Sequence, residues 1–262
     1  MSDLSQLLAS AQRTADGLQL DVSDNWLQGR SLFGGIQAAL AVEAMAALSE
    51  GLPLRTVQAT LFAPVPAGPV QIHAREIRRG KNTVHAEARF VDGEQTLALF
   101  IGVFGRGRES VVRHQPRTPE LPAGPGLEFR YVPGIFPAFL QHFEVTCLKG
   151  GPPFSGSGDH RQIFRVKLKD SASQTGLAHV LSLADYPPPV ALSHLRQPTP
   201  GSTLTWMIDL CSEDFSAEPL EGWIIDVQLL AADAGYTQQS VALYAPSGGL
   251  VALGRQCMVV FG

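Results

Sequence analysis

LFGGIQAALAVEAMAAL, the segment Leu32–Leu48, decides the fold class of this chain. Ala and Leu, two residues that favour helix, dominate it, and the paired glycines Gly34-Gly35 mark its start. A helix with so much apolar surface needs a second element to cover it. The segment therefore predicts a long helix packed against a sheet, and the strands of that sheet are expected in the residues that follow.

Four segments after this helix alternate polar and apolar residues, which is the period of a strand with one buried face. Turns that contain Pro and Gly separate them, as hairpin connections require. The expected strands are Thr56–Pro64, Val70–Ile77, Thr83–Phe90 and Thr96–Phe104. Together they predict an antiparallel meander that covers the helix.

The same order of elements occurs a second time. The second long helix is expected at Gly176–Leu195, followed by strands at Thr203–Leu210, Gly222–Leu230, Tyr236–Tyr244 and Leu250–Phe261. Between the copies, a Pro- and Gly-rich stretch excludes a continuous helix or strand. We expect an α+β fold with an N-terminal unit at 1–112, a linker at 113–137 and a C-terminal unit at 138–262. The two meanders can pair edge to edge into one continuous sheet.

The composition limits the classes of function. The 262 residues carry a formal net charge of −4 and no long run of Lys or Arg, so binding to nucleic acid or to an anionic membrane is not expected. No segment approaches the length of a membrane span or a signal peptide, which predicts a cytoplasmic protein. The three cysteines and seven histidines lack metal-ligand spacing, so no metal is expected.

Two short segments resemble a known family. WLQGRSLFGGIQAAL (Trp26–Leu40) and LADYPPPVAL (Leu183–Leu192) are similar to the double-hotdog acyl-CoA thioesterases, which include bacterial thioesterase II. The resemblance implies a tandem double hotdog in which each helix packs against its own meander. It also implies hydrolysis of a fatty or related acyl-CoA to free acid and CoA. Coenzyme A would enter as part of the substrate, and no further cofactor is implied.

The glycine pair has a chemical interpretation within this resemblance. Free backbone N–H groups at a helix N-terminus carry partial positive charge, and glycine lets a substrate oxygen approach them closely. Gly34 and Gly35 are therefore candidates for stabilising an oxyanion. The alternative is that the pair only ends a loop and lets the helix pack tightly.

The carboxylate that the family carries on a hotdog helix is found only in the second unit. Asp185 matches the family aspartate that orients and activates the attacking water. In the first unit Val42 takes that place, and the neighbouring Glu43 is expected to point elsewhere, because one residue on a helix turns a side chain by about 100°. One unit thus offers the glycines and the other offers the acid. The resemblance implies one composite site, unless Asp185 is only a helix end that faces water.

Thr203 and Gln256 match the hydroxyl and the amide that accompany the family aspartate. Either could instead be structural, since Thr is common in strands and a lone Gln can serve a neighbouring element. Thr205 is a reserve candidate for the hydroxyl. The expected apolar acyl pocket is formed by Trp26, Phe33, Phe62 and Trp206.

The sequence also departs from the family. Thr205-Trp206 stands where the family often has Asp-His, and the run Pro187–Pro189 follows Asp185 after one residue. Proline does not fit inside a helix, so the second helix is expected to break or to be displaced at this run. These departures favour a second hypothesis, a non-catalytic double hotdog that binds acyl-CoA or serves in assembly. The joint presence of the glycine pair, Asp185, Thr203 and Gln256 favours the enzyme. A homodimer or larger homo-oligomer is expected in either case.

Overall fold

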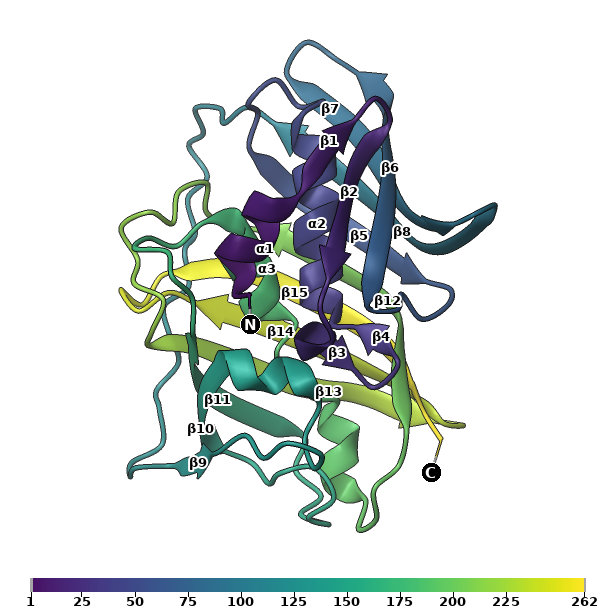
Figure 1. Cartoon of the computed structure of the whole chain (residues 1–262). Helices are drawn as coiled ribbons and strands as arrows, with labels where there is room; N and C mark the ends of the chain where they lie inside the picture. The colour runs from purple at the N-terminus through teal and green to yellow at the C-terminus, as the bar shows by residue number, and fades with distance from the viewer. Residues whose placement is uncertain (1, 262) are drawn as a thin grey trace.

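The computed structural model describes residues 2–261, so that Met1 and Gly262, the outermost residues of the two expected units, lie outside it. The described chain is an α+β fold in which one thirteen-stranded sheet covers two central helices (Figure 1). Every strand pairs antiparallel to its neighbours. No helix among these residues is long and apolar enough to cross a membrane.

The N-terminal half of the sheet contains six strands. In spatial order they are β1 (Gln12–Thr14), β2 (Gly17–Val22), β6 (Gly68–Arg79), β7 (Thr83–Asp92), β8 (Gln95–Gly105) and β5 (Leu54–Leu61). Alternation explains which face is buried: Val84, Ala86, Ala88 and Phe90 of β7 are all buried at every second position. The four strands expected after the first helix are confirmed.

The C-terminal half of the sheet contains seven strands. Their spatial order is β12 (Gly201–Leu210), β15 (Leu250–Val260), β14 (Tyr236–Tyr244), β13 (Trp223–Asp233), β11 (Arg161–Leu168), β10 (Phe143–Lys149) and β9 (Leu127–Phe129). The four strands expected here are also present. Strands that precede each helix, β2 in one half and β10 and β11 in the other, were not predicted.

The two half-sheets join through β5 and β12. These strands pair in register from Thr60 opposite Thr205 to Thr56 opposite Asp209. Most buried apolar side chains of both halves form one contiguous core, and a small second cluster of Ile163, Ile224, Tyr244 and Leu250 lies apart from it. A shared core is expected when two meanders share a sheet and enclose their helices between them.

The central helices differ in length. Helix α2 (Gly34–Ala46) agrees with the sequence prediction, but α3 (Leu177–Ala184) has only eight residues. The expectation of a second long helix over Gly176–Leu195 is therefore wrong, whereas the break expected at the proline run is present. Proline lacks the backbone N–H that a helix interior needs, and the run Pro187–Pro189 ends the helical path. The chain then forms a separate 3₁₀ helix, η3 (Val190–His194).

Smaller elements close the ends of this core. They are α1 (Leu4–Ser10), η1 (Asp24–Trp26), the two-stranded ribbon β3 (Leu27–Gln28) and β4 (Ser31–Leu32), and η2 (Ala138–His142). The β3–β4 ribbon leads directly into α2, whereas α1 lies beside α3 (Figure 1). These two placements distinguish the two ends of the helix pair.

Candidate active site

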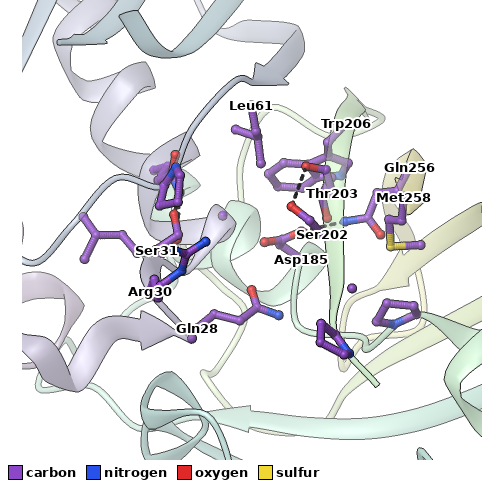
Figure 2. A pocket seen from close by; sticks show the side chains of 18 of the residues that line it. Gln28, Arg30, Ser31, Leu61, Asp185, Ser202, Thr203, Trp206, Gln256 and Met258 are labelled. Atoms are coloured by element: carbon purple, nitrogen blue, oxygen red, sulfur yellow. Dashed lines mark hydrogen bonds between the residues drawn. The ribbon is translucent and has the colours of Figure 1, made fainter. Parts of the chain in front are cut away.

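A cavity of about 560 Å³ opens where α2 begins and α3 ends. Its walls come from both halves: the β3–β4 ribbon and the end of β5 on one side, and the α3 end, β12 and β15 on the other. Figure 2 shows Gln28 and Arg30 across the cavity from Asp185, Thr203 and Gln256. The family resemblance predicts a composite site, and the two candidate groups from different halves do meet here.

Asp185 is the C-cap residue of α3 and lines this cavity. Its carboxylate lies against the N-terminus of α2, where it accepts a hydrogen bond from the backbone N–H of Gly35. A Cβ atom added to Gly34 would stand 2.6 Å from Oδ2 of Asp185. Glycine at 34 therefore makes the approach of the carboxylate to the helix N-terminus possible.

The surroundings of Asp185 change its acidity. Burial raises the pKa of its carboxyl to about 7, while the N–H of Gly35 and the amide of Gln256 act in the opposite direction. Burial dominates because it penalises the charged form more than two hydrogen bonds favour it. The group is thus poised to exchange a proton near neutral pH.

Gln256 of β15 is buried and donates from Nε2 to Oδ1 of Asp185 over 2.6 Å. Its own Oε1 accepts from Nε2 of Gln239, in the neighbouring strand β14, over 2.7 Å. Gln256 therefore does more than satisfy a neighbouring strand, because its amide directly contacts the candidate carboxylate.

Thr203 and Trp206 both line the cavity, although they stand an odd number of positions apart in β12. A β-bulge between Thr203 and Thr205 explains this, because the extra residue switches the side on which the following side chains lie. Thr205 is exposed and lies outside the cavity lining. The reserve assignment of Thr205 as the site hydroxyl is therefore wrong.

The aromatic residues expected around the acyl pocket separate into two groups. Trp206 and Phe62 line the cavity. Trp26 and Phe33 do not, because both are fully buried in the core, where Trp26 stacks on His142 and Phe33 stacks on Phe139. The prediction that these two side chains shape the pocket is wrong, since they pack the β3–α2 segment against η2.

The two glycines have different surroundings. A Cβ on Gly35 would meet the Cα of Ser182 at 2.8 Å, so Gly35 allows the backbones of α2 and α3 to pack closely. Gly34 lines the cavity, and its backbone N–H has no hydrogen-bond partner among residues 2–261. The packing interpretation of the glycine pair therefore holds for Gly35. The N–H of Gly34 is a helix N-terminal donor without a partner in the described chain, as an oxyanion site requires.

Several polar residues of the site were missed. Gln37 of α2 is buried, lines the cavity and donates from Nε2 to the carbonyl oxygen of Leu32. Gln239 is fully buried behind Gln256. Gln37 interrupts an otherwise apolar helix face, and Gln239 shares the buried face of β14 with Thr237, Val241 and Leu243. A buried amide at such a position is the signal that could have identified them. No three His, Cys, Asp or Glu side chains within the described part of the chain are grouped so that they could hold a metal ion.

This architecture, with two helices inside one sheet made from two similar halves, is that of a double hotdog. The family model for the acyl-CoA thioesterase N-terminal domain matches residues 22–105, and the model for the acyl-CoA thioesterase C-terminal domain matches residues 113–260. The chain belongs to the acyl-CoA thioesterase family. No curated protein sequence matches it.

Solved structures agree in fold. A conserved protein of unknown function with a hotdog fold from Alicyclobacillus acidocaldarius superposes with a TM-score of 0.88 at 19% identity, over 100% of this chain and 99% of that one. A TesB protein of Mycobacterium avium subspecies paratuberculosis gives 0.80 at 15%, over 100% of both chains. Acyl-CoA thioesterase II TesB2 of Mycobacterium marinum gives 0.76 at 13%, over 98% and 97%. At these identities the likeness shows the double-hotdog fold.

Proposed function

We propose that this protein hydrolyses a fatty or related acyl-CoA to the free acid and CoA, with Asp185 as the general base. One observation carries the proposal: the Asp185 carboxylate lies in a cavity at the N-terminus of α2, held there by Gly35 and Gln256. A base is most effective when its pKa lies near the working pH. Burial raises the pKa of Asp185 to about 7, which meets that condition.

In the proposed reaction, a water molecule donates a proton to Asp185 as its oxygen attacks the thioester carbonyl carbon. The resulting tetrahedral oxyanion collapses, the C–S bond breaks, and the departing sulfur of CoA takes the proton from Asp185. The products are the carboxylic acid and the free thiol, and the base is restored. Thr203 lines the same cavity and is proposed to hydrogen-bond the water.

The oxyanion is assigned to the N-terminus of α2. The N–H of Gly35 already serves Asp185, so the free N–H of Gly34 is the donor proposed for the substrate oxygen. A donor at a helix N-terminus also carries the partial positive charge of the helix dipole. In this assignment the N–H of Gly35 binds the base, Asp185, and the N–H of Gly34 binds the oxyanion of the substrate.

The acyl group is proposed to occupy the cavity beside Leu61, Phe62 and Trp206, with the pantetheine arm of CoA entering past the β3–β4 ribbon. A homodimer or larger assembly is also proposed, because β1 and β9 end the sheet without a further strand within the described residues. Light scattering of the purified protein measures the mass of the assembly and so distinguishes a monomer from a dimer or a larger oligomer.

Thiol release from acyl-CoAs of graded chain length tests the proposed activity. We expect turnover by the wild type and a loss of 100-fold or more in Asp185→Asn, the order of magnitude of a general base. Circular dichroism establishes that the variant is folded. Binding of acyl-CoA without turnover by the wild type would contradict the hydrolase and favour the acyl-CoA-binding protein considered from the sequence.

A further inference from the structure

A chain of hydrogen bonds leads from the backbone of the loop after α3 back to Asp185. The N–H of Val190 donates to Oε1 of Gln239 over 3.0 Å, Nε2 of Gln239 donates to Oε1 of Gln256, and Nε2 of Gln256 donates to Asp185. Two buried glutamines on adjacent strands thus connect Val190 to the carboxylate.

The direction of this chain is fixed by its first member. A backbone N–H can only donate, so the atom of Gln239 that faces Val190 must be the amide oxygen. The other end of that amide is then the nitrogen, which must meet the oxygen of Gln256. Gln256 has only its nitrogen left for Asp185.

The proline run supplies the donor that sets this direction. Pro187, Pro188 and Pro189 have no backbone N–H. Val190 is therefore the first residue after Tyr186 with an N–H to offer, and it opens the 3₁₀ helix, where that group has no partner within the helix. Gln239 satisfies it. The proline run, which departs from the family pattern, thus makes Val190 the first donor of the hydrogen-bond chain that leads to Asp185.

Burial makes the direction hard to reverse. Gln239 is 0% exposed and Gln256 is 2% exposed, so neither amide can turn toward water. Reversing Gln239 would set two N–H groups against each other at Val190, and the buried donors would lose their acceptors. The amide of Gln256 is thus expected to keep its nitrogen toward Asp185 whether that carboxyl is charged or neutral.

We propose that Gln239 is a positioning residue for the hydrolase: by holding the oxygen of Gln256, it keeps an N–H donor directed at Asp185 and denies that oxygen to the protonated acid. The inference rests on the proposed function of Asp185. Without Gln239, the amide of Gln256 turns over when Asp185 is protonated, and its oxygen accepts a hydrogen bond from the carboxylic acid O–H. The neutral acid then gains a partner, and Asp185 holds its proton to a higher pH.

Other charged groups do not provide this control. Arg30, on the opposite wall, is the other charged side chain among the residues that line the cavity. The neighbouring Tyr186 lies among Phe143 and Phe164 in the core. The groups that face the carboxylate from α2 and β15 are the neutral N–H of Gly35 and the amide of Gln256.

The test compares Gln239→Met with Gln238→Met. Met preserves the length of the side chain and removes both amide groups. Gln238 is the adjacent residue in β14 and donates to Sγ of Cys257, outside the chain that leads to Asp185. Carbon-13 NMR follows the titration of the Asp185 carboxyl, whose signal is the one missing from Asp185→Asn. The pH dependence of kcat/KM is measured on the same samples.

We expect the Asp185 titration midpoint to rise by about one pH unit in Gln239→Met and to stay unchanged in Gln238→Met. On the acid side of the profile kcat/KM should fall about tenfold in Gln239→Met, with rates within about twofold of the wild type at high pH. A loss of packing alone would lower the melting temperature without moving the midpoint.

Val190→Pro provides a second route if Gln239→Met does not fold. It removes the donor that sets the direction at a position where proline is tolerated, the first residue of a helical turn, and should raise the same midpoint. Equal midpoints in the wild type and the folded variant would overturn the role of Gln239, as would an equal shift in Gln238→Met. The NMR titration answers this even if the wild type hydrolyses no acyl-CoA, which would contradict only the proposed function.

Discussion

The two ends of the helix pair are built on the same plan and differ in chemistry. At one end the N-terminus of α2 faces a cavity and receives Asp185 from the other half. At the other end, α3 begins at Leu177 after the N-cap residue Gly176, whose N–H donates to Nδ1 of His179 in the first turn of the same helix. Counted from the first residue of each helix, Val42 of α2 stands where Asp185 follows α3.

Helix α1 covers the second end. Ser5 donates from both its N–H and its hydroxyl to the carboxylate of Asp170, and His179 lies beside the same pair. Leu4 and Leu7 of α1 are buried with them. The comparison shows that a hotdog pair can form two helix N-termini of which one faces a cavity and the other is covered by α1.

We call the end of the helix pair where α2 begins at Gly34 and faces the cavity the open end, and the end covered by α1 the closed end. The largest effect is expected from a methyl group at the open end. In Gly34→Ala the new Cβ displaces the Asp185 carboxylate, its nearest neighbour at 2.6 Å, and kcat/KM should fall by about 100-fold, roughly 3 kcal/mol. The matched control is Gly176→Ala at the closed end, where the nearest atom to the Cβ is Nδ1 of His179 at 3.7 Å. Steady-state kinetics that show equal losses in both variants would remove the distinction between the two ends.

Moving the acid to the closed end should not create a second site. Val42 is 4% exposed, and a carboxylate there lacks the glycine N–H and the amide that hold Asp185. We expect Val42→Asp to lower the free energy of unfolding by about 2–3 kcal/mol in urea titrations. The double variant Val42→Asp/Asp185→Asn should stay inactive, and recovered activity would contradict the account.

The charge at the open end should cost stability. Burial raises the pKa of Asp185 to about 7, so the folded state binds this proton more tightly than the unfolded chain. Stability from this group is therefore present at low pH and decreases as the pH rises toward 7. Asp185→Asn should be more stable than the wild type by about 1–2 kcal/mol at pH 8, with a smaller gain at pH 5. Thermal unfolding at both pH values measures this difference in stability. A larger gain in stability at pH 5 than at pH 8 would contradict a raised pKa for Asp185.

The closed end should show the opposite dependence on pH with a smaller effect. Although burial opposes it, hydrogen bonds from His179 and Ser5 hold the pKa of Asp170 well below its usual range. Its contribution is therefore present at neutral pH and lost as the pH falls below about 4. Asp170→Asn should lose about 1 kcal/mol of unfolding free energy at pH 7, measured by urea denaturation, with unchanged thiol release.

The parts of this asymmetry that follow local sequence rules could be predicted. Alternation and turn residues located the eight strands after the two helices, and the Ala- and Leu-rich segment located α2. The family resemblance brought Gly34, Asp185 and Gln256 to one place. The end of α3 at Ala184 also follows a local rule, since three prolines stand just beyond it and predict a break in the helix.

What could not be predicted depends on contacts distant in sequence. Nothing local shows that Trp26 stacks on His142 or that Gln239 stands behind Gln256. The side of the sheet on which Thr205 lies depends on a bulge formed by pairing with β15. Such features are set by which strands become neighbours, and the sequence pattern carries little information about that choice.

The most direct test of the open end as a hydrolytic site is the pH dependence of kcat/KM for thiol release in the wild type and in Asp185→Asn. With Asp185 as the base, the wild-type rate should fall about tenfold per pH unit below a midpoint near 7, the pKa to which burial raises this carboxyl. Asp185→Asn should retain at most about 1% of the rate and show no such limb. An acid limb with the same midpoint in the folded Asp185→Asn variant would contradict the assignment of the base.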